Sequence, residues 1–281
     1  MDIKQITDKV YGILDSNLYP EIMKKWHGLN SVRIANADKG SDPKKTVEKS
    51  QLITHEQNKA IVKSIKPIMQ KKLSAILPEA KFWFKGEEKP DAGLSWIVSI
   101  FDYELMAPAT TSVALLQEDE LLLGILGNFT QLEMIAGERG GGAWMESEEF
   151  KVGKNELSDK SSNMQFFPGK GTMDSTQKSL LNTFRKKFNI QSRVNRVEQC
   201  ISYNMSLVAR GAMDFSLGLN FSYPDIAAVV CIVEQAGGVV SDFSGGKSKL
   251  FAGEEYFCSN PIIHSQFIEL ANGISNQENK K

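Results

Sequence analysis

The sequence has few of the features that mark a secreted or membrane-spanning protein. Its 281 residues include only three cysteines, Cys200, Cys231 and Cys258, and none of them stands in a CxxC pair. Unpaired thiols of this kind suit a reducing compartment. The first residues, MDIKQITDKVYG, carry charges where a signal peptide needs an apolar run. No apolar run approaches the roughly 20 residues that span a bilayer, so we expect a cytoplasmic protein that binds no membrane.

An excess of charge of either sign is also missing. The 33 basic and 34 acidic residues give a net charge of -1, so the overall field gives no reason to expect a nucleic acid as partner. The three histidines, His27, His55 and His264, lie far apart and have no metal-ligand spacing with one another or with a cysteine. A zinc site is therefore not predicted.

Two hydrophobic patterns follow one another along the chain. Apolar residues at helical spacing predict helices over residues 2–26 and 56–76, and short β-branched and aromatic runs then predict mainly antiparallel strands. From about residue 164, strands and helices alternate, which favours βα units on a second sheet. We therefore predict an α+β half over residues 1–155, with a largely antiparallel sheet and two long helices, and an α/β half over residues 156–281, with a mixed sheet.

Several acidic residues stand at the ends of these predicted elements. Glu87 follows the strand KFWFKG, Asp102 ends the strand WIVSIFD, Asp225 precedes the helix IAAVVCIVEQAGG, and Glu56 opens the second long helix. Acids in such places can converge on one cleft and hold Mg²⁺. Each acid alone also has a plainer interpretation, as a surface charge or, for Asp225, as a helix N-cap. A second GEE, at 253–255, is predicted to lie in a surface loop.

Taken together, these segments resemble the inositol monophosphatase family of magnesium-dependent phosphomonoesterases. The family has a GEE after a strand, a WxxDPxDGT strand end, an (A/R)xGxGA hairpin and a WD before a helix ending EAGG. The similar segments here are GEE at 86–88, WIVSIFDYE at 96–104, ERGGGAW at 138–144 and PDIAAVVCIVEQAGG at 224–238. The resemblance covers nearly the whole chain and implies a layered αβαβα sandwich, a homodimer and a phosphorylated small molecule as ligand.

The resemblance also implies a role for each acid. Glu87, Asp102 and Asp225 match the acids that bind magnesium in the family. Glu56 matches the water-activating carboxylate loosely, since the family has an aspartate at that place. The implied cofactor is therefore Mg²⁺.

The segment around Asp102 departs from the family's motif. The acid that bridges two metal ions in the family falls on Ser99, and the Gly-Thr after the second aspartate becomes Tyr103 and Glu104. A serine hydroxyl supplies no charge to share between two cations about 4 Å apart, so we expect reduced magnesium affinity or a single metal ion. Glu104 could replace the missing charge as a catalytic acid, or it could be a solvent-facing loop residue.

The substrate side is altered in the same way. The family's small G(S/T)A turn before a helix falls on Gln199, Cys200 and Ile201, and these larger side chains would crowd a sugar or inositol ring. The acid that often binds a substrate hydroxyl falls on Gly218. Inositol phosphate is therefore not favoured as the substrate.

Three hypotheses about function follow. The first is a phosphatase-fold protein with a degenerate metal site, with weak or lost hydrolysis, that binds a phosphorylated small molecule. The second is an active Mg²⁺-dependent phosphatase of sugar, inositol or nucleotide phosphates with a rearranged carboxylate set. The third is a non-catalytic scaffold.

Overall fold

The computed structural model describes residues 1–22, 24, 43–102, 110–129, 131–157, 164–167, 173–188 and 200–278, without side chains at 43–58, 101–102, 164–167 and 275–278. The helical elements are α1 (Ile3–Ile13), the π-helical η1 (Leu14–Leu18), α3 (Pro43–Ser74), α4 (Ser175–Lys187), α5 (Ile201–Ala209), α6 (Tyr223–Gln235), α7 (Ser248–Phe251) and α8 (Pro261–Glu278). The strands are β1 (Lys81–Phe84), β2 (Leu94–Asp102), β3 (Thr110–Gln117), β4 (Glu120–Asn128), β5 (Glu133–Glu138), β6 (Gly142–Met145), β7 (Glu148–Glu149), β8 (Met164–Phe167), β9 (Phe215–Leu219), β10 (Val239–Ser241) and β11 (Glu255–Ser259).

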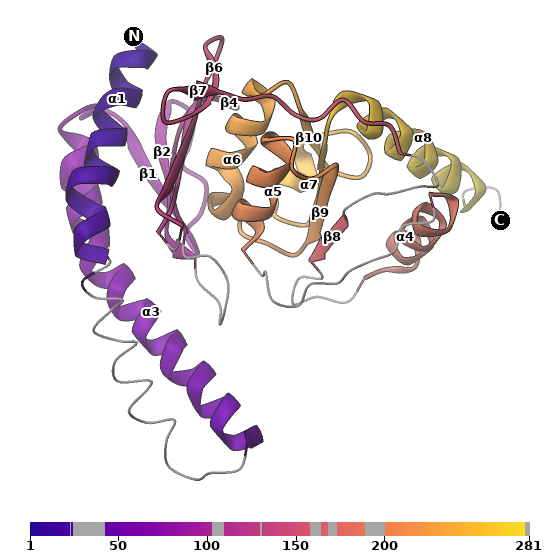
Figure 1. Ribbon diagram of the computed structural model, residues 1–281, viewed down its shortest axis with the longest axis horizontal. Coiled ribbons are helices and arrows are strands. Elements are labelled where there is room, and N and C mark those ends of the chain that lie inside the picture. Colours follow the sequence, from indigo (N-terminus) through magenta and orange to yellow (C-terminus); the bar gives the residue numbers. More distant parts are fainter. Residues whose placement is uncertain are drawn as a thin grey trace.

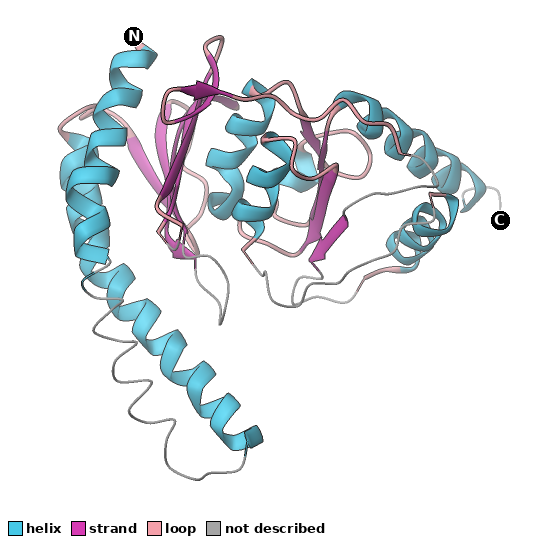
Figure 2. Ribbon diagram, viewed as in Figure 1, coloured by secondary structure: helices cyan, strands magenta, loops and turns pink. Residues whose placement is uncertain are grey.

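These elements form a layered sandwich of helices and sheets. Figure 1 shows α1 and α3 on one face of a seven-stranded sheet, and α5 and α6 between that sheet and a four-stranded one. Helices α4 and α8 lie beyond the second sheet, and Figure 2 shows the same alternation of helix and strand. The predicted αβαβα arrangement is confirmed.

The N-terminal helices cover the first sheet with one apolar face each. Helix α1 continues through η1 to residue 22, so the predicted helix is present as far as the structure describes it. Helix α3 begins earlier than predicted and buries Ile61, Ile65, Met69 and Leu73, which recur every three or four residues. That spacing places them on one side of a helix, where they pack against the sheet.

The seven-stranded sheet runs in the order β1-β2-β3-β4-β5-β6-β7. Its neighbours are antiparallel as predicted, except that β1 and β2 are parallel, with Phe84 beside Val98. Strand β3 is buried at every residue except its last. Helices therefore cover both faces, which explains why residues 113–116 of β3 form a continuous apolar run rather than an alternating pattern.

Two glycines let helix α6 lie close to this sheet. A Cβ atom at Gly124 would lie 2.1 Å from the backbone oxygen of Ala228, and one at Gly137 would lie 2.8 Å from the Cα of Ile232. Only a residue without a side chain fits at these distances. The position of α6, and of the residues at its first turn, therefore depends on β4 and β5.

The four-stranded sheet has the order β10-β11-β9-β8 and is mixed, with β8 and β9 parallel and the other pairs antiparallel. Its outer face packs against α4 and α8 through an aromatic cluster centred on Phe184, whose ring contacts those of Phe215, Phe257 and Phe267 at centroid distances of 5.0–6.0 Å. The prediction of a mixed sheet in this half is confirmed.

The second GEE does not lie wholly in a surface loop, as the sequence had suggested. Glu255 begins β11 and is only 2% exposed. Its carboxylate accepts hydrogen bonds from Gln177 Nε2 (2.9 Å), Phe243 N (3.3 Å) and Lys249 Nζ (3.3 Å). A buried acid is stable when it is paired in this way, and these partners are not visible in the local sequence.

Acidification below about pH 6.5 is expected to destabilise the protein through His264. This imidazole is buried, with Nε2 2.9 Å from Ser241 Oγ, and burial lowers the pKa of His264. Between the lowered and the ordinary pKa, the unfolded chain binds a proton that the folded chain does not, so stability falls as the pH falls. Urea unfolding of the wild type and of His264→Gln at about pH 7.5 and about pH 5.5 checks this. We expect a smaller loss of stability in His264→Gln, and an equal loss in both proteins would contradict the assignment.

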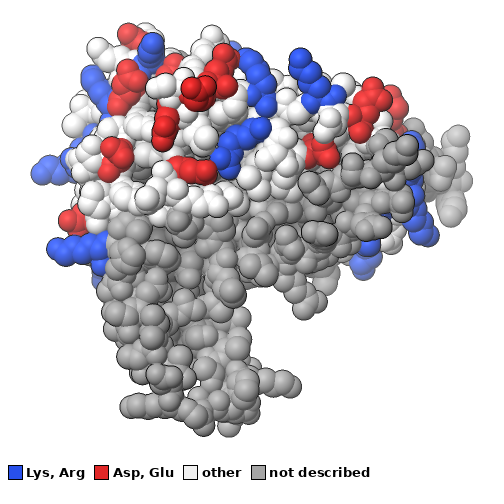
Figure 3. All heavy atoms as spheres, viewed as in Figure 1, with Lys and Arg blue, Asp and Glu red and all other residues white. Residues whose placement is uncertain are grey.

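The described surface carries charges of both signs. Figure 3 shows lysine and arginine interspersed with aspartate and glutamate over the described part of the viewed face. Among the described helices, none combines the length and the apolar character that a membrane crossing requires.

Candidate functional site

A tight turn after β1 carries the first two charged residues of the site, Lys85 and Glu87. Between them, Gly86 has a φ of +82°, in the region that favours glycine. The backbone N–H of Glu87 donates to Phe84 O (3.0 Å), and Trp83 Nε1 donates to Glu87 O (2.9 Å). These bonds fix the turn to the end of the strand, and its two charged side chains contact helices of different layers.

Asp225 meets this turn from helix α6. The helix begins at Tyr223 and its N-cap is Ser222, so the N-cap interpretation of Asp225 is wrong. The Asp225 side chain is 8% exposed: its Oδ1 accepts a hydrogen bond from Ser99 Oγ at 2.7 Å, and its Oδ2 pairs with Lys85 Nζ at 2.6 Å. The parallel register of β1 and β2 explains this meeting, since Lys85 and Ser99 each follow a residue of the last β1–β2 pair.

Glu87 is paired on the opposite side of the sheet. Its Oε1 lies 2.5 Å from the Nζ of Lys66 in α3, and its Oε2 accepts a hydrogen bond from Phe84 N at 3.3 Å. The Lys66 ammonium also lies over the Phe84 ring, 4.2 Å from its centroid. Both oxygens of Glu87, like both oxygens of Asp225, therefore have positively polarised partners.

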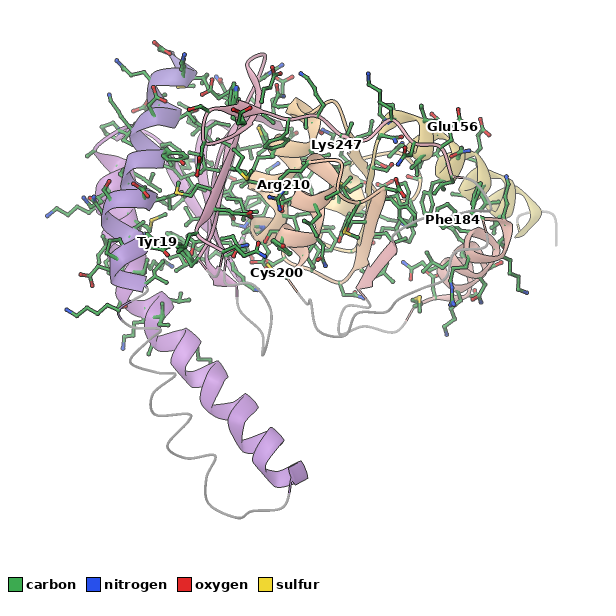
Figure 4. The ribbon with its side chains drawn as sticks, viewed as in Figure 1. Tyr19, Glu156, Phe184, Cys200, Arg210 and Lys247 are labelled. Carbon is green, nitrogen blue, oxygen red and sulfur yellow. The ribbon has the colours of Figure 1, made fainter. Side chains whose placement is uncertain are left out.

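A second polar cluster lies where β3 meets the start of α5. Thr110 Oγ1, Cys200 Sγ and Ser202 Oγ form a triangle with sides of 3.1–3.2 Å, and all three residues are buried. Figure 4 shows Cys200 and Arg210 at the two opposite ends of α5. Thr110 is also the backbone partner of Asp102, after an irregularity in the β2–β3 register. This pairing brings the backbone of Asp102 to the same end of the sheet as the cluster.

Several predicted site residues lie outside the described part of the structure. Tyr103, Glu104 and Gln199 are among them. Glu56 lies in α3 and Asp102 lies in β2, and the structure describes only the backbone of these two residues. Their proposed roles stay predictions.

Gly218, which was predicted on the substrate side, lies on β9 next to a buried tyrosine. A Cβ there would lie 2.4 Å from Cε1 of Tyr256, whose hydroxyl is 2.9 Å from Ser216 Oγ. The Tyr256 ring therefore needs the space that a larger residue at 218 would fill. A contact of Gly218 with a ligand stays a prediction.

The side chains that the structure describes do not form a magnesium site. Among them, no group of three or more His, Cys, Asp or Glu residues is placed to hold a metal ion. The two described acids from the predicted ligand set, Glu87 and Asp225, are paired with Lys66 and Lys85. Magnesium needs carboxylate oxygens that face the ion, so these residues as arranged do not fit it.

Three buried groups near α6 are held in their protonated forms. Burial raises the pKa of the Tyr223 phenol, which packs between the rings of Trp83 (5.4 Å) and Phe251 (4.7 Å). Burial also raises the pKa of the thiols of Cys231 and Cys258. None of these groups is suited to act as a base or nucleophile near neutral pH.

The sequence had not singled out Lys66, Lys85, Thr110 or Ser202. The family resemblance rests on acidic residues, which are the residues that bind magnesium. A lysine directly before GEE was a visible signal for Lys85, whereas nothing local connects Lys66 with Glu87, 21 residues later.

The layered architecture is that of solved inositol monophosphatases. Inositol monophosphatase II from Staphylococcus aureus superposes with a TM-score of 0.66 at 13% identity, covering 92% of each chain. The extragenic suppressor protein suhB from Bartonella henselae superposes with a TM-score of 0.63 at 19% identity, covering 77% of this chain and 90% of that one. At these identities, the likeness defines the class of fold.

The sequence comparisons define the family. A profile of the inositol monophosphatase family matches residues 107–276, and the chain belongs to that family. It is 27% identical over 167 residues to a fructose-1,6-bisphosphatase/inositol-1-monophosphatase of Thermotoga maritima, covering 58% of this chain and 60% of that protein. It is 31% identical over 161 residues to an inositol-1-monophosphatase of Mesorhizobium japonicum, covering 56% and 58%. The matched region thus spans about three fifths of these relatives, and the family match includes Asp225 but not Glu87 or Ser99.

Proposed function

We propose that this chain is a phosphatase-fold protein that binds a phosphorylated small molecule and has weak or no Mg²⁺-dependent phosphomonoesterase activity. The observation that carries the proposal is the arrangement at Asp225. Both oxygens of this buried carboxylate are engaged, one by the Ser99 hydroxyl and one by the Lys85 ammonium. A carboxylate held in this way is not free to bind a metal ion.

The chemistry of the family explains why this matters for hydrolysis. Metal ions in such enzymes activate water and neutralise the charge that develops on the phosphoryl group. Loss of one preorganised electrostatic contact typically costs about 100- to 1000-fold in rate. The metal-binding acids act as one unit, so their losses do not simply multiply. Hydrolysis at least about 100-fold slower than in an intact relative is therefore the expected result.

Binding of a phosphorylated ligand is supported by the positive groups of the site. Lys66 and Lys85 place two ammonium groups around the turn after β1, with side chains that are 33% and 55% exposed. An ammonium group is a common partner for phosphate.

The proposal includes a cytoplasmic location and a homodimer. Buried free thiols at Cys200, Cys231 and Cys258 support the location, because they suit a reducing compartment. The homodimer is carried over from the family resemblance.

The test is an assay of the purified wild type against a panel of sugar, inositol and nucleotide phosphates. We expect ligand binding, measured by calorimetry, to persist in excess chelator. Phosphate release in millimolar magnesium should be at least about 100-fold below that of the Thermotoga relative measured in parallel. Brisk, chelator-sensitive release that Asp225→Asn abolishes would establish the active phosphatase instead. Failure of every phosphate ester to bind would favour the scaffold.

A further inference from the structure

The turn after β1 lies between two layers of the fold and meets a helix from each. Figure 1 shows α3 on one face of the seven-stranded sheet and α6 on the other. Lys66 of α3 pairs with Glu87, and Asp225 of α6 pairs with Lys85. Each of these contacts joins one acid of the predicted metal set to one lysine.

In both contacts, a lysine ammonium lies beside the carboxylate, where a metal cation would bind it. Oδ2 of Asp225 lies 2.6 Å from Lys85 Nζ, and Oε1 of Glu87 lies 2.5 Å from Lys66 Nζ. The second oxygen of each acid accepts a hydrogen bond, from Ser99 Oγ at 2.7 Å and from Phe84 N at 3.3 Å. Each acid is therefore compensated by groups of the chain itself, and a buried carboxylate such as Asp225 requires such compensation.

Ser99 completes this arrangement. Its hydroxyl donates to Asp225, whereas an aspartate at the same place would bring a second negative charge within hydrogen-bonding distance of the first. Two carboxyl groups that close stay ionised together only with a cation between them, and otherwise one of them takes up a proton. A neutral donor at 99 and an ammonium at 85 together balance one acid without a divalent ion.

We propose that Lys85 and Lys66 are built-in cations that replace the divalent metal of this site, so that Asp225 and Glu87 exclude Mg²⁺ while the lysines remain in place. The inference deepens the proposed function and rests on it, because the turn after β1 is also the proposed ligand site. Lys85 is the principal group, because its carboxylate partner is the buried one. Removal of the Lys85 charge should leave Asp225 uncompensated and open to a metal ion.

The experiment is a titration with Mn²⁺ alone. Binding is measured by calorimetry and by the electron paramagnetic resonance signal of free manganese. The proteins are the wild type, Lys85→Met, Lys66→Met and the matched control Lys89→Met. Lys89 follows the same turn but pairs with Asp119, away from Asp225 and Glu87. We expect Lys85→Met to bind manganese at least about tenfold more tightly than the wild type, Lys66→Met to show a smaller gain, and Lys89→Met to behave like the wild type.

Two further variants keep the test decisive. Should Lys85→Met fail to fold by circular dichroism, Lys85→Gln retains a hydrogen-bond donor without the charge and should show the same gain. Ser99→Asp combined with Lys85→Gln should bind manganese more tightly than Lys85→Gln alone. Equal manganese affinity in the wild type and the Lys85 variants would overturn the inference, as would an equal gain in Lys89→Met.

The outcome also separates this inference from the proposed function. If no phosphate ester binds but the manganese series behaves as expected, the proposed function fails and the replacement of the metal by lysine stands. If a phosphate ester binds in chelator but removal of the Lys85 charge gives no gain in manganese affinity, the proposed function stands and this inference fails.

Discussion

Replacement of Gly124 by alanine is expected to destabilise the protein by about 3 kcal/mol or more, which is a large effect for a single methyl group. The added Cβ would lie 2.1 Å from the backbone oxygen of Ala228 and within 2.9 Å of its Cα. A helix backbone cannot move aside as the end of a side chain can, so α6 would have to separate from β4. The shift would also displace Asp225 in the first turn of α6.

A matched control lies three residues further along the same strand. A Cβ at Gly127 would meet no atom closer than 3.7 Å, so Gly127→Ala should change stability by less than about 1 kcal/mol. For a protein of this size, the first variant should lower the melting temperature by about 6 °C or more. Thermal unfolding of the two variants beside the wild type makes the comparison. Equal melting temperatures for Gly124→Ala and Gly127→Ala would contradict the packing described for α6.

Reversal of the charge at Lys85 should have the largest effect on ligand binding. Lys85→Glu removes an ammonium and places a carboxylate beside the buried acid Asp225. A unit charge about 4 Å away contributes roughly 4 kcal/mol at an effective dielectric constant near 20. Because Lys85 is 55% exposed, solvent screening reduces this contribution. We expect the affinity for a phosphate ester in chelator to fall by at least about 100-fold, or about 2.7 kcal/mol.

The control for this prediction is Lys89→Glu, which makes the same change of charge in a lysine paired with Asp119. It should lower the affinity only slightly, through the overall field, and added salt should remove that small effect. The measurement is calorimetry with the tightest phosphate ester from the panel. An unchanged affinity in Lys85→Glu would show that the ligand binds away from the turn after β1.

The fold could be predicted from the sequence to a large extent, because its main signals are local. Apolar residues at helical spacing predicted a helix over residues 56–76, and α3 includes that segment as far as Ser74. The β-branched and apolar segment at 110–117 is typical of a strand, and β3 has those bounds. The start of α6 was placed three residues late, at Ile226 rather than Tyr223, because Asp225 was interpreted as a helix N-cap. Proline fits the first turn of a helix, where its missing N–H has no partner to lose, and α6 indeed includes it.

The site was less predictable, because its partners come from distant parts of the chain. The resemblance predicts Glu87 and Asp225 as metal ligands, but the contact between Ser99 and Asp225 joins residues 126 positions apart and has no local signal. Lys66 carries no motif, and Lys85 is marked only by the GEE that follows it. The pairing of both lysines depends on the packing of α3 and α6 against the two faces of one sheet. Glu255 illustrates the same limit, since a buried acid reads as a surface residue until its partners are known.

Electrostatics connects these observations into one account. A divalent ion about 4 Å from an ammonium group is opposed by roughly 8 kcal/mol at an effective dielectric constant near 20. Magnesium therefore reaches Asp225 only if Lys85 turns away, and the carboxylate then exchanges one cation for another. The family fold is retained, and in our proposal the lysines hold the acids that the family resemblance assigns to a metal ion.

Crystals of the wild type soaked in manganese test this account most directly, because anomalous scattering locates the ion without reference to activity. The account predicts no manganese beside Asp225, with Lys85 Nζ within hydrogen-bonding distance of that carboxylate. Two well-occupied manganese ions among Glu87, Asp102 and Asp225, with Lys85 turned into solvent, would contradict it.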